Sequence, residues 1–99
     1  MTDDKAEIIQ SLFEVLKSRK EELPEDSYTT TLLTHEKGEN IILEKLGEEM
    51  TELLLAAKDD DLDEITHESA DIIYHLLVLF VHYDMELDDL FEELRSRRN

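Results

Sequence analysis

Five carboxylates in two segments of the chain have the residue types and the spacing of a metal site. Glu48, Glu49 and Glu52 stand in the first segment, and Glu68 and Asp71 stand in the second. Carboxylates that share a partly dry site repel one another and lose hydration unless a cation lies between them. For oxygen ligands that cation is most often Mg²⁺. The pattern therefore predicts an acidic Mg²⁺ site inside a helical bundle.

The first carboxylate segment lies in a predicted helix from Ile41 to Lys58. One broad face of this helix is apolar and comprises Ile42, Leu46, Met50, Leu53, Leu54 and Ala57. The opposite face carries Lys45 and the three glutamates. An acidic face is normally only a solvated face, but Ile41, Leu55 and Ala56 fall on this one too. These apolar residues indicate that another element covers the carboxylates, so a solvated face and a metal site both stay open.

The second carboxylate segment lies in a predicted helix from Asp63 to about Tyr83. No formally charged residue occurs between Ile72 and Tyr83, and apolar side chains lie all round this part of the helix, which predicts burial on every side. Glu68, Asp71 and His75 share one face with core positions, so solvation explains them poorly. Salt bridges to Lys45 or Lys58 are the structural alternative to a metal.

Three histidines of the second helix, His67, His75 and His82, raise the question of zinc. Asp71 and His75 have the i, i+4 spacing that permits chelation. A set dominated by Glu and Asp nevertheless suits a hard cation better than zinc. His75 is therefore interpreted as a residue that orients a carboxylate, or as a hydrogen-bonded core histidine.

Further helices are predicted on either side of the central pair. The first runs from Asp4 to about Lys20, and its Arg19 and Lys20 either complement the helix dipole or reach a phosphate. An aspartate of the acidic connection 59–63 is expected to cap the second central helix. A last amphipathic helix is indicated by Leu87, Leu90, Phe91 and Leu94.

The segment from Glu21 to Gly38 is predicted to be a loop, because Pro24 disfavours helix just before it and Gly38 marks a break. Loops of this length in a small domain are usually functional or disordered. Ser27, Tyr28 and Thr29 offer hydroxyl groups to a ligand. Equally, Ser27 or Thr29 caps a short helical turn and Tyr28 anchors the loop.

Composition bounds the class of protein. With two Gly, one Pro and no Cys in 99 residues, composition predicts a single all-α domain, residues 1–99, with three or four helical segments and a modest core that dimerisation would enlarge. The net charge of −17 argues against a basic nucleic-acid surface, but not against a nucleotide that Mg²⁺ bridges to carboxylates. The charged start lacks a signal region and no apolar run is long enough for a membrane, so a cytoplasmic protein is expected.

Both carboxylate segments and the loop before them resemble a known family. The matching residues are Ser27-Tyr28-Thr29, Lys45-x-Gly47-Glu48-Glu49-x-x-Glu52, Ala56-Ala57-Lys58 and Glu68-x-Ala70-Asp71-x-x-Tyr74-His75-Leu76-Leu77. This combination is similar to the phosphoribosyl-ATP pyrophosphatases of histidine biosynthesis, which belong to the MazG-like all-α nucleoside triphosphate pyrophosphatases. The likeness covers residues 13 to 94, and Ile41 departs from it because the family often has Lys there.

The resemblance implies hydrolysis of phosphoribosyl-ATP to phosphoribosyl-AMP and pyrophosphate, with Mg²⁺. It also implies an all-α bundle of four to five helices, completed by homodimerisation. Glu48, Glu49, Glu52, Glu68 and Asp71 would hold the metal, and one of them would accept the proton of the attacking water. The residues that would contact the substrate are Arg19, Lys20, Ser27, Tyr28, Thr29, Lys45, Lys58 and His75. Two other functions stay open: a house-cleaning pyrophosphatase acting on another nucleotide such as dUTP, and a non-enzymatic acidic adaptor that binds a basic partner.

Overall fold

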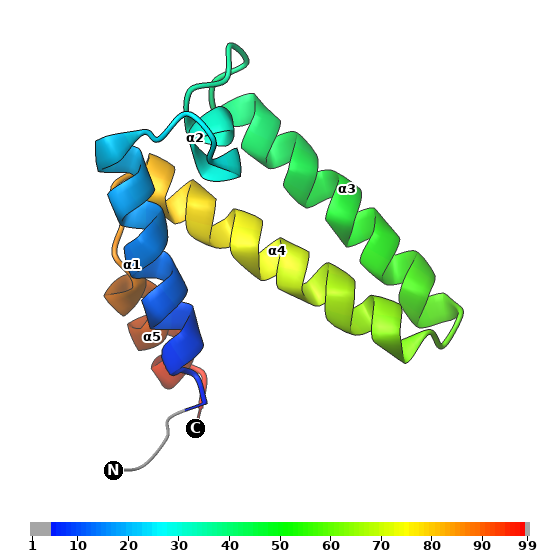
Figure 1. The fold of residues 1–99 in the computed structure, drawn as a ribbon. Coiled ribbons are helices and arrows are strands. Elements are labelled where there is room, and N and C mark those ends of the chain that lie inside the picture. Colours follow the sequence, from blue (N-terminus) through cyan, green and yellow to red (C-terminus); the bar gives the residue numbers. More distant parts are fainter. Residues whose placement is uncertain (1–4, 99) are drawn as a thin grey trace.

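The computed structural model describes residues 5–98, and all regular structure within that range is helical (Figure 1). The elements are α1 (Glu7–Glu22), α2 (Tyr28–Leu33), α3 (Glu39–Lys58), α4 (Leu62–His82) and α5 (Leu87–Ser96). The predicted all-α class with four to five helices is confirmed. Asp4, the predicted start of the first helix, lies outside the described residues. Among residues 5–98, no helix combines the length and the apolar character that a membrane crossing requires.

The ends of three helices follow from local residues. α1 ends at Leu23, whose φ of 48° lies in the left-handed region, and Pro24 follows it. Gly38, with a φ of 63°, precedes α3, as the predicted break requires. Asp61 caps α4, because its side chain accepts a hydrogen bond from the backbone N–H of Glu64 at 3.2 Å. The prediction that an aspartate of this connection is a cap is therefore confirmed.

The segment predicted as a loop contains α2. Ser27 Oγ accepts a hydrogen bond from the backbone N–H of Thr30 at 3.3 Å, which confirms the alternative in which this serine caps a short helical turn. Leu32 is buried and anchors the helix in the core. A loop prediction was wrong for residues 28–33, because six residues are too few to show a helical period.

The apolar core lies at one end of the molecule. α3 and α4 form an antiparallel hairpin, and α1 and α2 pack near the end of α4 that leads to α5 (Figure 1). The buried core residues are Phe13, Leu16, Leu32, Ile42, Leu77, Val78, Val81 and Leu87. The turn end of the hairpin extends away from this core, so its side chains face only the two helices or solvent.

The apolar face predicted for α3 is only partly buried. Glu49 and Ala56 lie on the side that faces α4 and are buried, whereas Met50 and Leu54 are 46% and 60% exposed. Leu55, which was expected to be covered, is 61% exposed. The reason is that α4 follows the i, i+7, i+14 line of Ile42, Glu49 and Ala56, which is rotated from the centre of the apolar face.

Burial of the last part of α4 is also less complete than predicted. Leu77, Val78 and Val81 are buried by α1, but Ile73 is 42% exposed and Tyr83 is 53% exposed. Helices from this one chain cover one side of α4 and leave the other open. The predicted burial on every side is therefore wrong for the single chain.

Candidate active site

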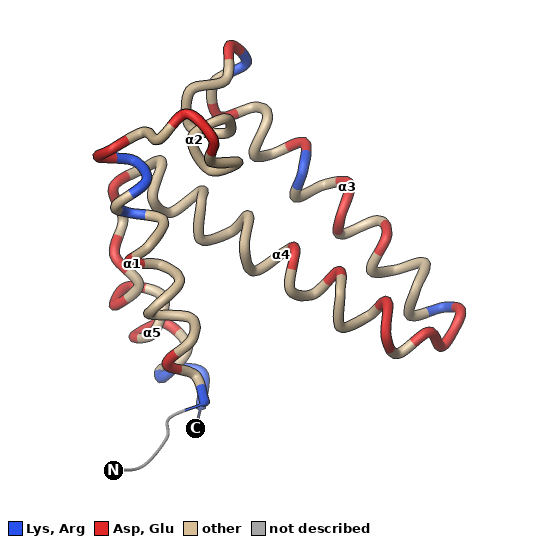
Figure 2. Tube along the Cα trace, viewed as in Figure 1, with Lys and Arg blue, Asp and Glu red and all other residues tan. Residues whose placement is uncertain are grey.

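The carboxylates of both sequence segments lie on facing helices. Figure 2 shows acidic residues along α3 and α4 in the part of the hairpin that extends from the core. Glu49 and Glu52 come from α3, and Glu68 and Asp71 come from α4, which runs antiparallel to it. Glu49 and Glu68 are buried, although no apolar core surrounds this part of the hairpin. Two carboxylates buried between facing helices require hydrogen-bond donors or cations as partners.

His75 is the hydrogen-bond partner of the buried Glu49 carboxylate. Nδ1 of this buried histidine lies 2.7 Å from Glu49 Oε1 and 3.0 Å from the carbonyl oxygen of Asp71. Nε2 lies 3.0 Å from the hydroxyl oxygen of Tyr28. Both partners of Nδ1 are acceptors, so this nitrogen carries a proton and donates, while Nε2 is within hydrogen-bond distance of the Tyr28 hydroxyl group. The alternative in which His75 orients a carboxylate agrees with this geometry.

The hydrogen bond from His75 occupies one oxygen of Glu49 and leaves Oε2 for another partner. It also holds the ring and the carboxylate in one orientation, as histidines and carboxylates beside metal sites do. Tyr28 comes from α2, so the short helix is joined to the carboxylate on α3 through a residue of α4. Three elements therefore set the position of Glu49.

A second pair of hydroxyl groups secures α2. Thr29 is buried, and its Oγ1 lies 2.6 Å from the hydroxyl oxygen of Tyr74 on α4. The rings of Tyr28 and Tyr74 are stacked with centroids 6.0 Å apart, and both rings meet the His75 ring edge to face. Partial burial, with smaller effects from Tyr74 and nearby carboxylates, raises the pKa of Tyr28. The hydroxyl group thus stays protonated. No sequence pattern indicated the contact between Thr29 and Tyr74.

Glu68 is a buried carboxyl group with an oxygen that lacks a partner. Burial first, and then the neighbouring Glu52 carboxylate, raise its pKa from 4.5 to about 7. Its Oε1 has no hydrogen-bond partner within residues 5–98. A buried polar atom of this kind is costly unless a ligand, an ion or water satisfies it. Glu52, Glu64 and Asp61 line an open hollow beside Glu68.

His67 lies beside the carboxylates of α4. This histidine was not among the predicted site residues. Its Nε2 lies 3.4 Å from Asp71 Oδ2, and potential ligand atoms of His67, Glu68 and Asp71 all lie within 4.8 Å of one another. The i, i+4 spacing of His67 and Asp71 could have identified this pair. The remaining predicted ligand, Glu48, is exposed and pairs with Lys45 at 3.8 Å.

The donor set fits a divalent cation. Carboxylate oxygens predominate, Glu68 has an unpartnered buried oxygen, and Glu49 keeps one oxygen free of His75. Burial, and then the neighbouring Glu52 carboxylate, raise the pKa of Glu68, and a bound cation would oppose both effects. Glu49, Glu52, Glu68 and Asp71 are thus the residues that could hold a metal from two sides of the hairpin.

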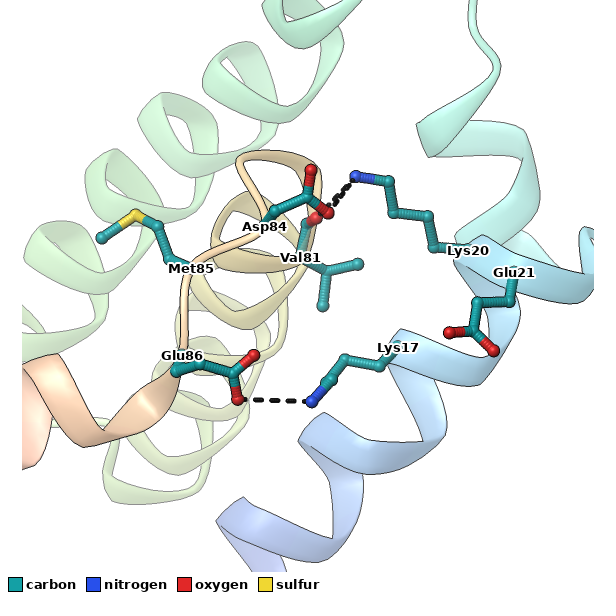
Figure 3. Close-up of a pocket in the computed structure, with 7 residues that line it drawn as sticks. All are labelled: Lys17, Lys20, Glu21, Val81, Asp84, Met85 and Glu86. Atoms are coloured by element: carbon teal, nitrogen blue, oxygen red, sulfur yellow. Dashed lines mark hydrogen bonds and ion pairs between the residues drawn. The ribbon is translucent and has the colours of Figure 1, made fainter.

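The predicted basic residues lie in different places. Lys20 is engaged at the end of α4, where its Nζ donates to the carbonyl oxygen of Val81 at 3.0 Å (Figure 3). It also donates to the carbonyl oxygen of His82 at 3.2 Å. It also pairs with Asp84 at 2.8 Å, as the dashed line in Figure 3 marks. Lys20 therefore neutralises the negative end of a helix dipole, although of α4 rather than of its own helix.

The other basic residues remain accessible. Arg19 lines a hollow with Ser27 where α1 leads into α2. Lys58 is exposed in the last turn of α3, near the turn end of the hairpin. Lys45 is half-buried on α3 beside Glu48. These positions leave Arg19, Lys45 and Lys58 available to an anionic ligand, whereas Lys20 already has three partners.

Comparison with known proteins matches nearly the whole chain to one family. The family described as "Phosphoribosyl-ATP pyrophosphohydrolase" matches residues 9–98. A protein of Haloarcula marismortui named phosphoribosyl-ATP pyrophosphatase is 63% identical over 98 residues, which are 99% of this chain and 100% of the relative. One of the same name from Natronomonas pharaonis is 68% identical over 95 residues, 96% of this chain and 94% of the relative.

A longer relative contains the same sequence pattern. The histidine biosynthesis bifunctional protein HisIE of Caldanaerobacter subterraneus is 47% identical over 96 residues, which are 97% of this chain but 46% of that protein. The similarity thus extends across the five described helices, including the carboxylate segments of α3 and α4.

Proposed function

Because the chain belongs to the phosphoribosyl-ATP pyrophosphohydrolase family, we propose that it hydrolyses phosphoribosyl-ATP to phosphoribosyl-AMP and pyrophosphate at the carboxylates between α3 and α4. The observation that carries this location is the buried Glu68, which has an oxygen without a hydrogen-bond partner in the described part of the chain and lies beside Glu52 of the facing helix. The phosphoribosyl-ATP pyrophosphohydrolases are enzymes, so the alternative of a non-enzymatic adaptor finds no support. Hydrolysis of another nucleotide, such as dUTP, is the remaining alternative.

Mg²⁺ is the proposed cofactor, with Glu49, Glu52, Glu68 and Asp71 as its protein ligands. When bound, Mg²⁺ would supply charge neutralisation for the triphosphate and for the leaving pyrophosphate. Oxygen ligands on two facing helices match the preference of this ion, which usually keeps several water molecules and binds one or two carboxylates with substrate phosphates. Glu48, already paired with Lys45, is proposed to lie at the edge of this set.

The residues of the chain would orient the reacting groups. His75 holds Glu49 in one orientation, so that Oε2 is fixed relative to the phosphates and the attacking water. One carboxylate of the set accepts the proton of that water. Arg19, Lys45 and Lys58 would offset phosphate charge, and Ser27, Tyr28 and Thr29 would present α2 to the nucleotide. Lys20 contacts the end of α4 and Asp84, and it could bind the substrate only after these contacts break.

A homodimer is part of the proposal. Leu43, Met50 and Leu54 lie at i, i+7 and i+11 on α3 and are 46%, 46% and 60% exposed. Such a stripe of large apolar residues commonly marks an interface. Leu55 of α3 and Ile73 of α4 are also exposed in the single chain. A cytoplasmic location is proposed as well, supported by the biosynthetic role in the name of the relative HisIE.

The test is pyrophosphate release from phosphoribosyl-ATP with and without Mg²⁺. We expect release by the wild-type chain only when Mg²⁺ is present, and loss of release in Asp71→Asn with unchanged helical content by circular dichroism. Glu44→Gln is the matched control, because it neutralises an exposed carboxylate on α3 that pairs with Lys37. Faster release from dUTP than from phosphoribosyl-ATP would contradict the substrate assignment. Normal turnover by Asp71→Asn would contradict the proposed site.

A further inference from the structure

We propose that His67 is a nitrogen ligand of the cation site, and that it raises the affinity of this site for transition-metal ions such as Mn²⁺ relative to its affinity for Mg²⁺. The inference deepens the proposed function and rests on its metal site. His67 immediately precedes Glu68 and stands one helical turn before Asp71. Each of the three residues offers one ligand atom, and these atoms lie within 4.8 Å of one another. One cation can therefore contact all three.

An independent feature of Glu68 indicates that a cation belongs at this cluster. Glu68 is 5% exposed, and its Oε1 lacks a hydrogen-bond partner within residues 5–98. A buried carboxylate oxygen without a donor is costly in free energy, and the adjacent Glu52 carboxylate adds repulsion to that cost. A cation bound by the Glu68 carboxylate would remove both penalties.

The position of His67 suits a ligand better than a structural residue. Its side chain is 64% exposed, so no packing holds the ring in place and its replacement leaves the core intact. Nε2 points to Asp71 Oδ2 at 3.4 Å, which is longer than a good hydrogen bond. That pair leaves space for an ion to approach both atoms. The simpler explanation is an i, i+4 ion pair on a helix surface.

The chemistry of the donor atoms determines which cations His67 helps the site to bind more tightly. Carboxylate oxygens serve Mg²⁺ and Mn²⁺ alike, whereas an imidazole nitrogen favours transition metals. Mg²⁺ binds oxygen almost exclusively and keeps much of its water, so it gains little from the histidine. A site with Glu68, Asp71 and the neutral ring of His67 therefore binds Mn²⁺ more tightly than the carboxylates alone would.

The experiment compares Mn²⁺ and Mg²⁺ binding by the full chain and by His67→Gln, without substrate. Free Mn²⁺ is measured by electron paramagnetic resonance, and Mg²⁺ is measured by its competition with Mn²⁺. We expect His67→Gln to weaken Mn²⁺ binding about tenfold or more, and Mg²⁺ binding by much less. His82→Gln is the matched control, because it removes a histidine from the other end of the same helix.

A spectroscopic signature separates ligation from a surface ion pair. Mn²⁺ bound to the wild-type chain should show ¹⁴N modulation in the electron spin echo, and the modulation should disappear in His67→Gln. A complementary variant, His67→Glu, replaces the nitrogen with a hard oxygen ligand and should lower the ratio of Mn²⁺ to Mg²⁺ affinity. Circular dichroism in EDTA checks that all variants are folded.

Three results would overturn the inference: an unchanged affinity ratio in His67→Gln, the absence of ¹⁴N modulation, or failure of the wild-type chain to bind either ion. Failure of the proposed function would look different. In that case the wild-type chain would not release pyrophosphate from phosphoribosyl-ATP with either ion, whatever the effect of His67 on the affinity ratio.

Discussion

At the scale of single residues, His75 determines what Glu49 can do. A glutamate on an amphipathic helix would ordinarily face water, but this one is buried against α4 and accepts a hydrogen bond from the histidine at 2.7 Å. The hydrogen bond gives the buried Glu49 carboxylate a partner inside the hairpin and leaves its other oxygen, Oε2, for a further partner. Removal of the histidine should therefore affect folding and chemistry together.

We predict that His75→Leu lowers the free energy of unfolding by about 2–3 kcal/mol, because it leaves a buried carboxylate without its partner. Pyrophosphate release should fall by about 10–100-fold, as is usual when the residue that orients a ligand is lost. Urea unfolding and the release assay measure the two effects. Tyr28→Phe is the milder control, since it removes only the hydroxyl group that bonds Nε2, and Tyr28 is half exposed. Equal stability of His75→Leu and wild type would refute this account.

Glu68 should determine the response of the protein to metal. In Glu68→Gln the melting temperature should rise in EDTA near neutral pH, because the amide removes the repulsion from Glu52. The same variant should lose most of the stabilisation that Mg²⁺ gives the wild-type chain by mass action. Thermal unfolding with and without Mg²⁺ measures both, with Glu44→Gln as the control. An undiminished Mg²⁺ effect in Glu68→Gln would exclude this carboxylate from the site.

At the scale of elements, side chains from α1 hold the end of α4. Lys20 donates to the carbonyl oxygens of Val81 and His82 in the last turn of α4, and it pairs with Asp84 just beyond. Lys17 makes a parallel contact with Glu86 at 3.3 Å (Figure 3). These contacts fix the connection from α4 to α5, and they place a basic residue predicted for substrate in a structural role.

The Lys20 contact should make stability depend on pH. Hydrogen bonding to Lys20 and its charge lower the pKa of Asp84 below the usual 3.8. A lowered carboxyl pKa contributes stability that is present above the unfolded pKa and is lost as the pH falls through the folded pKa. We therefore expect Asp84→Asn to melt below the wild type near neutral pH, with a difference that shrinks below about pH 3.8.

Asparagine is a suitable replacement because Asp84 has a φ of 58°, a conformation that Asn tolerates. The control is the double variant with Lys20→Gln, in which Asp84→Asn should have little further effect. A stability difference that persists unchanged at low pH would show that Asp84 acts through something other than its charge.

At the scale of the whole molecule, the core and the candidate site occupy different parts of the hairpin. Apolar side chains of α1, α2, α3 and α4 fill the end near α5, while the turn end combines buried carboxylates with exposed leucines. A single chain of 99 residues buries a limited fraction of its surface. The exposed stripe of α3 is consistent with a partner that would complete the burial.

We predict that Leu54→Lys weakens self-association, since it places a charge at the most exposed residue of the apolar stripe of α3. Leu54 is 60% exposed, so the substitution should leave the fold of the single chain intact. Sedimentation equilibrium should show a dimer for the wild type and association weakened about tenfold or more, or 1.4 kcal/mol, for the variant. Ile8→Lys is the control at a similarly exposed position, on α1. A monomeric wild-type chain would contradict the proposed dimer.

The sequence by itself determined the helical class, four of the five helices and the residue types of the site. Long segments with a period of 3.6 residues report helices reliably, and carboxylates on otherwise apolar helices report an unusual demand for charge. The capping role of Asp61 and the break at Gly38 were likewise readable, because caps and left-handed glycines depend on neighbouring residues alone.

Only the tertiary structure decided which side of α3 faces α4, and therefore that Glu49 is buried while Leu54 is not. It also decided that Tyr28, His75 and Glu49 are linked by hydrogen bonds and that His67 lies beside Asp71. The contact of Lys20 with the end of α4 likewise depends on the tertiary structure. The physical reason is that helix rotation and packing depend on contacts between residues far apart in the chain. Periodicity within one helix defines a broad face, but not the line along which a neighbouring helix packs.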